Sequence, residues 1–157
     1  MDSKYKVGGY VKLAKLWERS KDAVVAYHSS YYAEKFKDDT DKELFGVYID
    51  ITGNKEIFKR PEMVHLLRDC KMGKINLISS QTRAYLAANT CEFCFLLQYL
   101  FDLPMRIDIV TDDNDQRIDT ILDVEDQRRS LKVLAEKYTA IRKADYLAWR
   151  ARLENEM

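Results

Sequence analysis

The fold of this chain is decided largely within residues 59–90, KRPEMVHLLRDCKMGKINLISSQTRAYLAANT. Proline is favoured in the first turn of a helix and glycine just past its end, so Pro61 and Gly73 predict a helix over PEMVHLLRDCK. The apolar run Ile75–Ser80, INLISS, has the length and composition of a β-strand. This stretch therefore contains one helix followed by one strand.

Three further strand-length runs, rich in β-branched and aromatic residues, lie outside this stretch: Lys6–Leu13 (KVGGYVKL), Leu44–Ile51 (LFGVYIDI) and Arg106–Thr111 (RIDIVT). Helical patterns separate them, over Trp17–Lys37 and from a cap at Asn89 or Thr90 through Phe101. Regular alternation of strand and helix predicts an α/β fold. We expect a mostly parallel sheet of four or five strands with helices on both faces.

The last third of the chain departs from this alternation. Residues 119–157 contain no glycine or proline, and apolar residues recur with a period near 3.5, at Leu131, Leu134, Tyr138, Ile141, Ala148 and Trp149. The pattern predicts an α/β region over residues 1–118, followed by one long helix over residues 119–157. This apolar seam either folds back over its own sheet or is covered by a second chain, and we favour the second chain.

Length and composition fit one globular domain without a membrane span. The chain has 157 residues, 46% hydrophobic and 33% charged, and no apolar run approaches the roughly 20 residues that cross a bilayer. No signal-type stretch follows the N-terminus, and the three cysteines are an odd number, so a cytosolic protein with reduced thiols is expected.

Charge is balanced overall but unevenly distributed. The 26 basic and 26 acidic residues cancel, which argues against a strongly basic DNA-binding surface. Residues 55–83 nevertheless hold seven basic against three acidic residues, and residues 127–157 hold eight against four. Such basic excess fits a nucleic-acid partner, although solvated faces have the same appearance and are the simpler interpretation.

Motifs for cofactors and metals are missing from the sequence. Gly8-Gly9 lies in the predicted strand Lys6–Leu13 and completes no GxGxxG or GxxxxGK[ST] pattern, so no nucleotide cofactor is expected. Cys91-x-x-Cys94 has metal-ligand spacing, but no second pair accompanies it and both thiols fall in an apolar helix. Buried packing is the favoured interpretation of both cysteines, and no metal site is expected.

The segment Lys59–Thr90 resembles the core of the resolvase/invertase family of serine recombinases, in its large-serine-recombinase branch. The family pattern there is approximately K-R-P-x-x-x-x-x-L-x-D-x-x-x-G-K-I-D-x-I-x-x-x-x-x-S-R-x-x-R-N-T, and the register holds without a gap from Arg60 to Thr90. VGGYVKLAK resembles the family's Y-x-R-V-S strand, and VYIDITGNKEIFKRPEM resembles its Y-x-D-x-G-x-S-G-x-x-x-x-R-P segment. The resemblance covers roughly Val7 to Tyr138 and implies a resolvase-like fold with a long C-terminal dimerisation helix.

The resemblance also implies a chemistry that this chain does not retain. The family cleaves DNA with a serine hydroxyl, forms a 5′-phosphoserine link and neutralises the transition state with clustered arginines. By position the nucleophile falls on Ala14, the strand arginine on Lys12, and the two arginines of S-R-x-x-R-N-T on Tyr85 and Ala88. Only Arg60 and the Asn89-Thr90 pair match the family. Because alanine has no nucleophilic oxygen, the resemblance predicts an inactive site.

Three functions remain open from the sequence. The favoured one is a degenerate resolvase-type domain that acts in DNA recombination as a homodimer or as a heterodimer with a recombinase. The second is an active strand transferase that uses a displaced nucleophile, with Ser20, Ser79 or Ser80 and Arg83 as candidates. The third is a module that binds a small ligand at the carboxyl ends of its strands.

DNA contact, if retained, is expected to be weak and salt-dependent, because no C-terminal DNA-binding module follows the terminal helix in this sequence. Five basic residues are the candidates for contact with DNA or phosphate: Lys12, Arg60, Arg83, Arg128 and Arg129. We expect Lys12, Ala14, Arg60 and Tyr85 to converge at the carboxyl end of the first strand.

Overall fold

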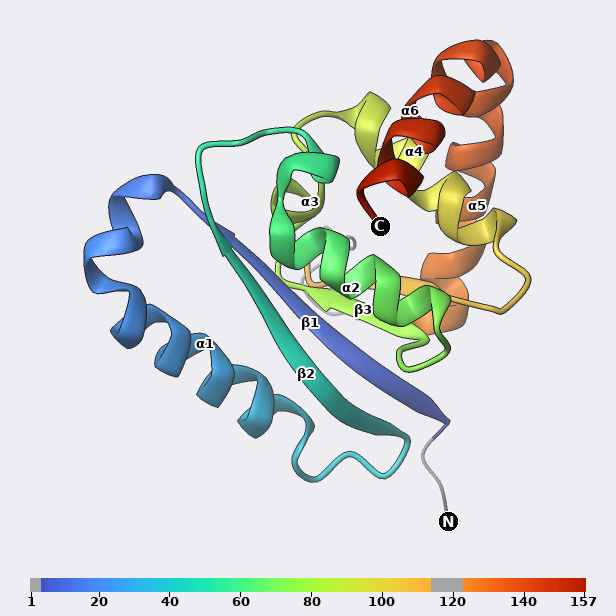
Figure 1. Ribbon diagram of the computed structural model, residues 1–157. Helices are drawn as coiled ribbons and strands as arrows, with labels where there is room; N and C mark the ends of the chain where they lie inside the picture. The colour runs from blue at the N-terminus through green and yellow to red at the C-terminus, as the bar shows by residue number, and fades with distance from the viewer. Residues whose placement is uncertain (1–3, 114–122) are drawn as a thin grey trace.

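The computed structural model describes residues 4–113 and 123–157 and places four parallel strands in one sheet (Figure 1). The strands are β1 (Tyr5–Leu13), β2 (Lys42–Ile51), β3 (Leu77–Ser80) and β4 (Asp108–Thr111), in the order β2-β1-β3-β4. The predicted α/β class and the predicted parallel sheet are confirmed.

The remaining elements are short 3-10 helices and α-helices. They are η1 (Lys15–Ser20), α1 (Lys21–Phe36), η2 (Ile57–Lys59), α2 (Pro61–Lys71), α3 (Arg83–Leu86), α4 (Thr90–Asp102), α5 (Val124–Ile141) and α6 (Lys143–Glu156). None of the helices in the described residues is both long and apolar enough to span a membrane.

The strand order explains why helices cover both faces of the sheet. The chain moves in one direction from β1 to β2, then in the opposite direction from β2 past β1 to β3 and on to β4. Because parallel crossovers are right-handed, this reversal puts α1 on one face and α2 and α4 on the other (Figure 1). A small hydrophobic cluster lies under α1, and the main core lies between the sheet and α2, α4 and α6.

The centre of β1 leaves no space for a side chain at Gly8 or Gly9. A Cβ on Gly8 would lie 2.6 Å from Cδ1 of Leu66 in α2, and a Cβ on Gly9 would lie 2.8 Å from the Tyr32 ring in α1. The glycine pair therefore allows helices on both faces to approach the central strand, a packing role rather than a phosphate-binding one.

The C-terminal region differs from the prediction. A long helix is present, since α5 has 18 residues, but one uninterrupted helix to the end of the chain is wrong. The helical path breaks at Arg142, with φ −122° and ψ 39°, and α6 folds back over α4. The predicted start at residue 119, and with it the 118/119 boundary, lies outside the described residues.

The apolar seam explains this reversal. Leu131 and Trp149 are buried within the chain's own core, whereas Ile141 is 79% exposed. Trp149 packs on Phe95 with ring centroids 5.9 Å apart, and α6 thereby covers the apolar face of α4. Part of the seam is therefore buried within one chain, contrary to our expectation that a second chain covers all of it, and Ile141 and Ala148 stay exposed.

Candidate functional site

The candidate site lies at the carboxyl end of β1 and β2. Lys12 is in register with Asp50 on β2, and the amide of Thr52 donates to the carbonyl of Leu13 at 3.0 Å. Ala14 follows immediately, is exposed and forms the N-cap of η1. Ala14, on which the resemblance puts the family's nucleophile, thus lies on the surface at the end of β1.

A buried carboxylate organises the floor of this site. Asp50 is 3% exposed, and its Oδ2 accepts from the Tyr10 hydroxyl at 2.8 Å. Its two oxygens also accept from the first free amides of α2, those of Glu62 at 3.0 Å and Met63 at 2.9 Å. Burial and the adjacent Asp50 carboxylate raise the pKa of Tyr10 well above its ordinary value. Asp50 therefore acts as the N-terminal cap of α2. Nothing in the sequence indicated this role, although Asp50 belongs to the Y-x-D pattern quoted above.

Arg60 is the one predicted catalytic arginine that this chain keeps, and it is only 1% exposed. Its guanidinium donates to four backbone carbonyls: Asn54 at 3.3 Å, Lys55 at 2.6 Å, Tyr85 at 2.8 Å and Leu86 at 3.4 Å. These bonds join the segment after β2 to α3. The donors of Arg60 are therefore directed at the protein's own backbone.

Lys12 completes a cluster of cations beside Arg60. Burial lowers the pKa of Lys12, and the nearby charges of Arg60 and Lys55 lower it further, while Asp50 acts in the opposite direction. Lys12 is partly exposed, so its ammonium is more accessible than the buried Arg60 guanidinium.

Of the four residues that we expect to converge, Lys12, Arg60 and Tyr85 lie close together, and Ala14 lies at the same end of the sheet. Lys12 and Arg60 interact electrostatically, and Tyr85 contacts Arg60 through its backbone carbonyl. Ala14 follows β1 at the same end of the sheet. Ala88 is exposed beside the N-cap of α4. Neither Tyr85 nor Ala88 can supply the guanidinium that the family pattern has there.

The other predicted phosphate ligands are engaged elsewhere. The Arg83 guanidinium lies 5.1 Å from the centroid of the Phe93 ring. Arg128 forms an ion pair with Asp108, and Arg129 forms one with Asp126.

Register shows that Arg128 lies far from Lys12 along the sheet. Asp108 is aligned with Leu77, and Leu77 with Val7, five residues before Lys12 on β1. At about 3.3 Å per residue, this is an offset of about 16 Å. The structure therefore does not unite Arg128 with the Lys12–Arg60 cluster.

The candidate replacement nucleophiles also differ in their surroundings. Ser79 and Ser80 are buried, and the Ser80 hydroxyl donates to the carbonyl of Tyr10 at 2.8 Å. Ser20 is exposed at the start of α1. Ser80 therefore links β3 to β1, Ser79 is buried, and Ser20 alone of the three is accessible.

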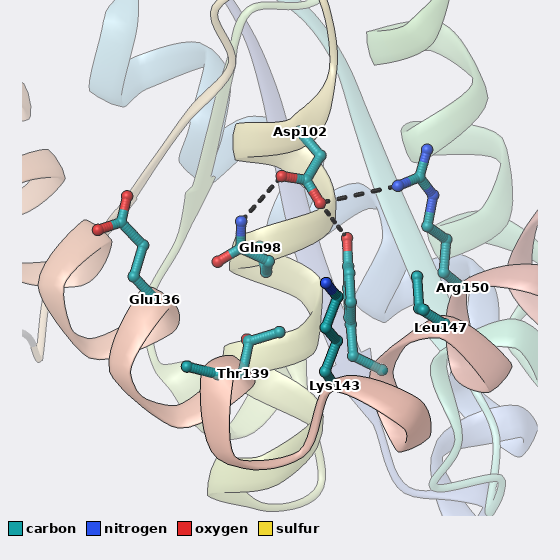
Figure 2. Close-up of a pocket in the computed structure, with 9 residues that line it drawn as sticks. Gln98, Asp102, Glu136, Thr139, Lys143, Leu147 and Arg150 are labelled. Atoms are coloured by element: carbon teal, nitrogen blue, oxygen red, sulfur yellow. Dashed lines mark hydrogen bonds and ion pairs between the residues drawn. The ribbon is translucent and has the colours of Figure 1, made fainter.

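A second feature, which the sequence analysis did not anticipate, is a pocket of about 340 Å³ between α4, α5 and α6 (Figure 2). Asp102 at its wall accepts from Gln98 at 2.8 Å and from the Tyr146 hydroxyl at 2.7 Å, and it pairs with Arg150 at 3.7 Å. These contacts fasten α6 to α4. The pocket follows from the reversal at Arg142, which no local sequence signal indicates.

Comparison with known proteins identifies the fold. No family model and no curated protein matches the sequence. Among solved structures, the crystal structure of the N-terminal catalytic domain of TP901-1 integrase matches with a TM-score of 0.58 and 16% identity, over 90% of this chain and 99% of that one. The chain has the resolvase fold. A resolvase family site-specific recombinase from Streptococcus pneumoniae also matches, with a TM-score of 0.57 and 16% identity, over 95% of this chain and 99% of that one.

The resolvase-like domain has the architecture of these structures. A partly exposed ammonium, a buried guanidinium and a buried carboxylate lie together, and alanine follows β1. Within residues 4–113 and 123–157, no three His, Cys, Asp or Glu side chains are grouped so as to hold a metal ion. The edge can attract an anion through Lys12, but Ala14 cannot attack one.

Proposed function

We propose that this resolvase-like domain takes part in site-specific DNA recombination as a catalytically inactive dimerisation or regulatory partner. The link to recombination rests on the fold, which the chain has in common with an integrase catalytic domain and a site-specific recombinase. Action in the cytosol, as expected from the sequence, is part of this proposal.

The observation that carries the inactivity is the side chain after β1. Ala14 is exposed where the family pattern has its serine, and losing a covalent nucleophile removes the reaction path altogether. Arg60 adds to this, because its donors are already bonded to four backbone carbonyls. Removing even one preorganised donor typically slows an enzyme by about 10²–10³.

A supercoiled-plasmid assay tests the inactivity. We expect no nicked or linear product from the wild-type protein or from Ala14→Ser, because the restored serine still lacks arginines at Tyr85 and Ala88. An active serine recombinase on its own site is the positive control. Nicking by the wild type that is lost in Ser20→Ala would instead establish the displaced-nucleophile alternative.

The partner role rests on apolar residues that α5 and α6 leave on the surface. Val133 is 67% exposed, Ile141 79% and Leu147 50%, whereas Leu131 and Trp149 are buried in the chain's own core. Exposed apolar area of this kind favours a second chain, either a copy of this one or a recombinase.

Light scattering at micromolar concentration, with and without an added recombinase, tests the association. We expect a dimer or a mixed complex that dissociates when Val133, Ile141 and Leu147 are each replaced by Asp. Substitution of Leu16, exposed on η1, by Asp is the matched control and leaves the assembly intact. A protein that stays monomeric alone and with a recombinase would refute the partner role.

A further inference from the structure

The cysteines Cys91 and Cys94 occupy the first turns of α4 in an arrangement that the proposed function does not use. Asn89 caps the helix by accepting from the amide of Glu92 at 2.9 Å, and the two cysteines follow with i,i+3 spacing. Cys91 is partly exposed, whereas Cys94 is buried. Buried packing, the interpretation favoured from the sequence for both thiols, is correct only for Cys94.

We propose that Cys91 and Cys94 form a reversible disulfide by exchange with a small disulfide such as oxidised glutathione. Residues three apart on a helix have Cβ atoms about 5–6 Å apart, and a disulfide needs about 3.5–4.5 Å. Closing the bond therefore requires the Cβ atoms of Cys91 and Cys94 to approach each other by about 1–2 Å within the first turns of α4. A disulfide under such strain is readily reduced again, as a regulatory bond must be.

The two thiols have different parts in the exchange. The partly exposed Cys91 thiolate attacks one sulfur of the oxidised glutathione, which releases one glutathione thiolate and leaves a mixed disulfide on Cys91. The Cys94 thiol then gives its proton, through solvent, to the glutathione thiolate released first, and the Cys94 thiolate attacks Sγ of Cys91 and releases the second glutathione as a thiolate, which takes up a proton from water. Two protein thiols are thereby oxidised and one glutathione disulfide is reduced to two thiols.

Neighbouring side chains support these two parts. Burial raises the pKa of Cys94, Cys91 adds to the increase, and the Arg83 guanidinium opposes it. The raised pKa makes Cys94 less ready than an exposed thiol to ionise, which fits the first attack being made by the partly exposed Cys91. Tyr138 of α5 lies against Cys91: burial raises the pKa of the Tyr138 phenol, and the Cys91 thiol adds to the shift.

Glu92, one of the two residues between the cysteines, connects this turn to η2 and α6. Glu92 is 8% exposed, and its Oε2 accepts from the amide of Ile57 in η2 at 3.2 Å and from the Trp149 indole in α6 at 3.3 Å. Tightening the turn moves the backbone that carries this carboxylate. The disulfide therefore changes the attachment of α6 to α4.

Mass spectrometry of the full chain in mixtures of reduced and oxidised glutathione tests the site. We expect a loss of about 2 Da, mapped to Cys91–Cys94 and reversed by dithiothreitol. Cys70, which is fully buried and distant in sequence, stays a thiol, and Cys70→Ser is the control that still forms the bond. Cys94→Ser stops at glutathione on Cys91. A wild-type protein that stops there too, or that keeps three thiols, would overturn the proposal.

Fluorescence of Trp149 tests the coupling to α6. Trp17, which is 45% exposed, is replaced by Phe so that one indole remains. Oxidation is expected to shift the emission of Trp149, and the shift is absent in Cys91→Ser. If the disulfide forms and the emission of Trp149 stays constant, the coupling between the cysteine pair and α6 is wrong. Neither measurement involves DNA, so both are independent of the proposed function.

Discussion

Replacing Arg60 with alanine distinguishes a structural role of this arginine from a phosphate-binding role. Its guanidinium makes two short bonds, to the carbonyls of Lys55 at 2.6 Å and Tyr85 at 2.8 Å, and two longer ones. Hydrogen bonds to charged groups contribute about 1.5–3 kcal/mol each, and the removed charge also stops paying its burial cost. We expect Arg60→Ala to lower the free energy of unfolding by about 3–5 kcal/mol.

Urea unfolding followed by circular dichroism measures this loss. For a chain of this size, such a change lowers Tm by roughly 10 °C. Arg60→Lys is expected to lose most of the same stability, because one ammonium cannot reach carbonyls on two separate segments. The matched control is Arg129→Ala, whose side chain is 72% exposed and pairs with Asp126, with an expected loss of at most about 0.5 kcal/mol.

The result that would refute this reasoning is a stable Arg60→Ala protein. If its free energy of unfolding fell by less than about 1 kcal/mol while its salt-dependent affinity for DNA dropped, Arg60 would be a phosphate ligand and the four carbonyl contacts would be incidental.

Three other predictions concern the sheet, the tyrosines and the terminal helices. Gly9→Ala is expected to cost about 1–3 kcal/mol of stability in urea unfolding, because its Cβ would meet the Tyr32 ring, whereas Gly53→Ala, with nothing within 4 Å, is expected to have little effect. Burial raises the pKa of Tyr99 from 10.0 to about 12, so the free energy of unfolding should decline as the pH rises from 10 toward 12. In unfolding curves measured across this range, Tyr99→Phe is expected to make that decline shallower. Trp149→Ala should cost about 3–5 kcal/mol equally at low and high protein concentration, and a cost that depends on concentration would show that a second chain covers this residue.

The predicted helix and strand positions were accurate where local signals set them. Pro61 begins α2, as predicted, and Asn89 caps α4, which ends at Asp102 before Pro104. Caps and prolines act on amides within one turn, so their effect is contained in a few consecutive residues. The predicted helix over Trp17–Lys37 was less accurate, because residues 15–20 form the separate 3-10 helix η1.

The candidate site was predictable in outline only. Alignment of the residue pattern put Lys12 and Arg60 at one edge, and the structure places them there. Which groups the Arg60 guanidinium contacts depends on where α3 packs, 25 residues later in the chain. The position of Arg128 likewise depends on strand register, because its partner Asp108 lies on β4.

The sequence by itself determined the α/β alternation, the ends of α2 and α4, and the alanine that follows β1 at position 14, because each is a property of a residue and its near neighbours. Only the tertiary structure decided the reversal at Arg142 and the burial of Arg60. Trp149 turns α6 back because its indole reaches Glu92, 57 residues earlier, and rings of α4. The periodic seam of α5 and α6 is compatible with a partner chain or with the chain's own core, and the choice depends on which apolar surface the rest of the fold leaves beside it.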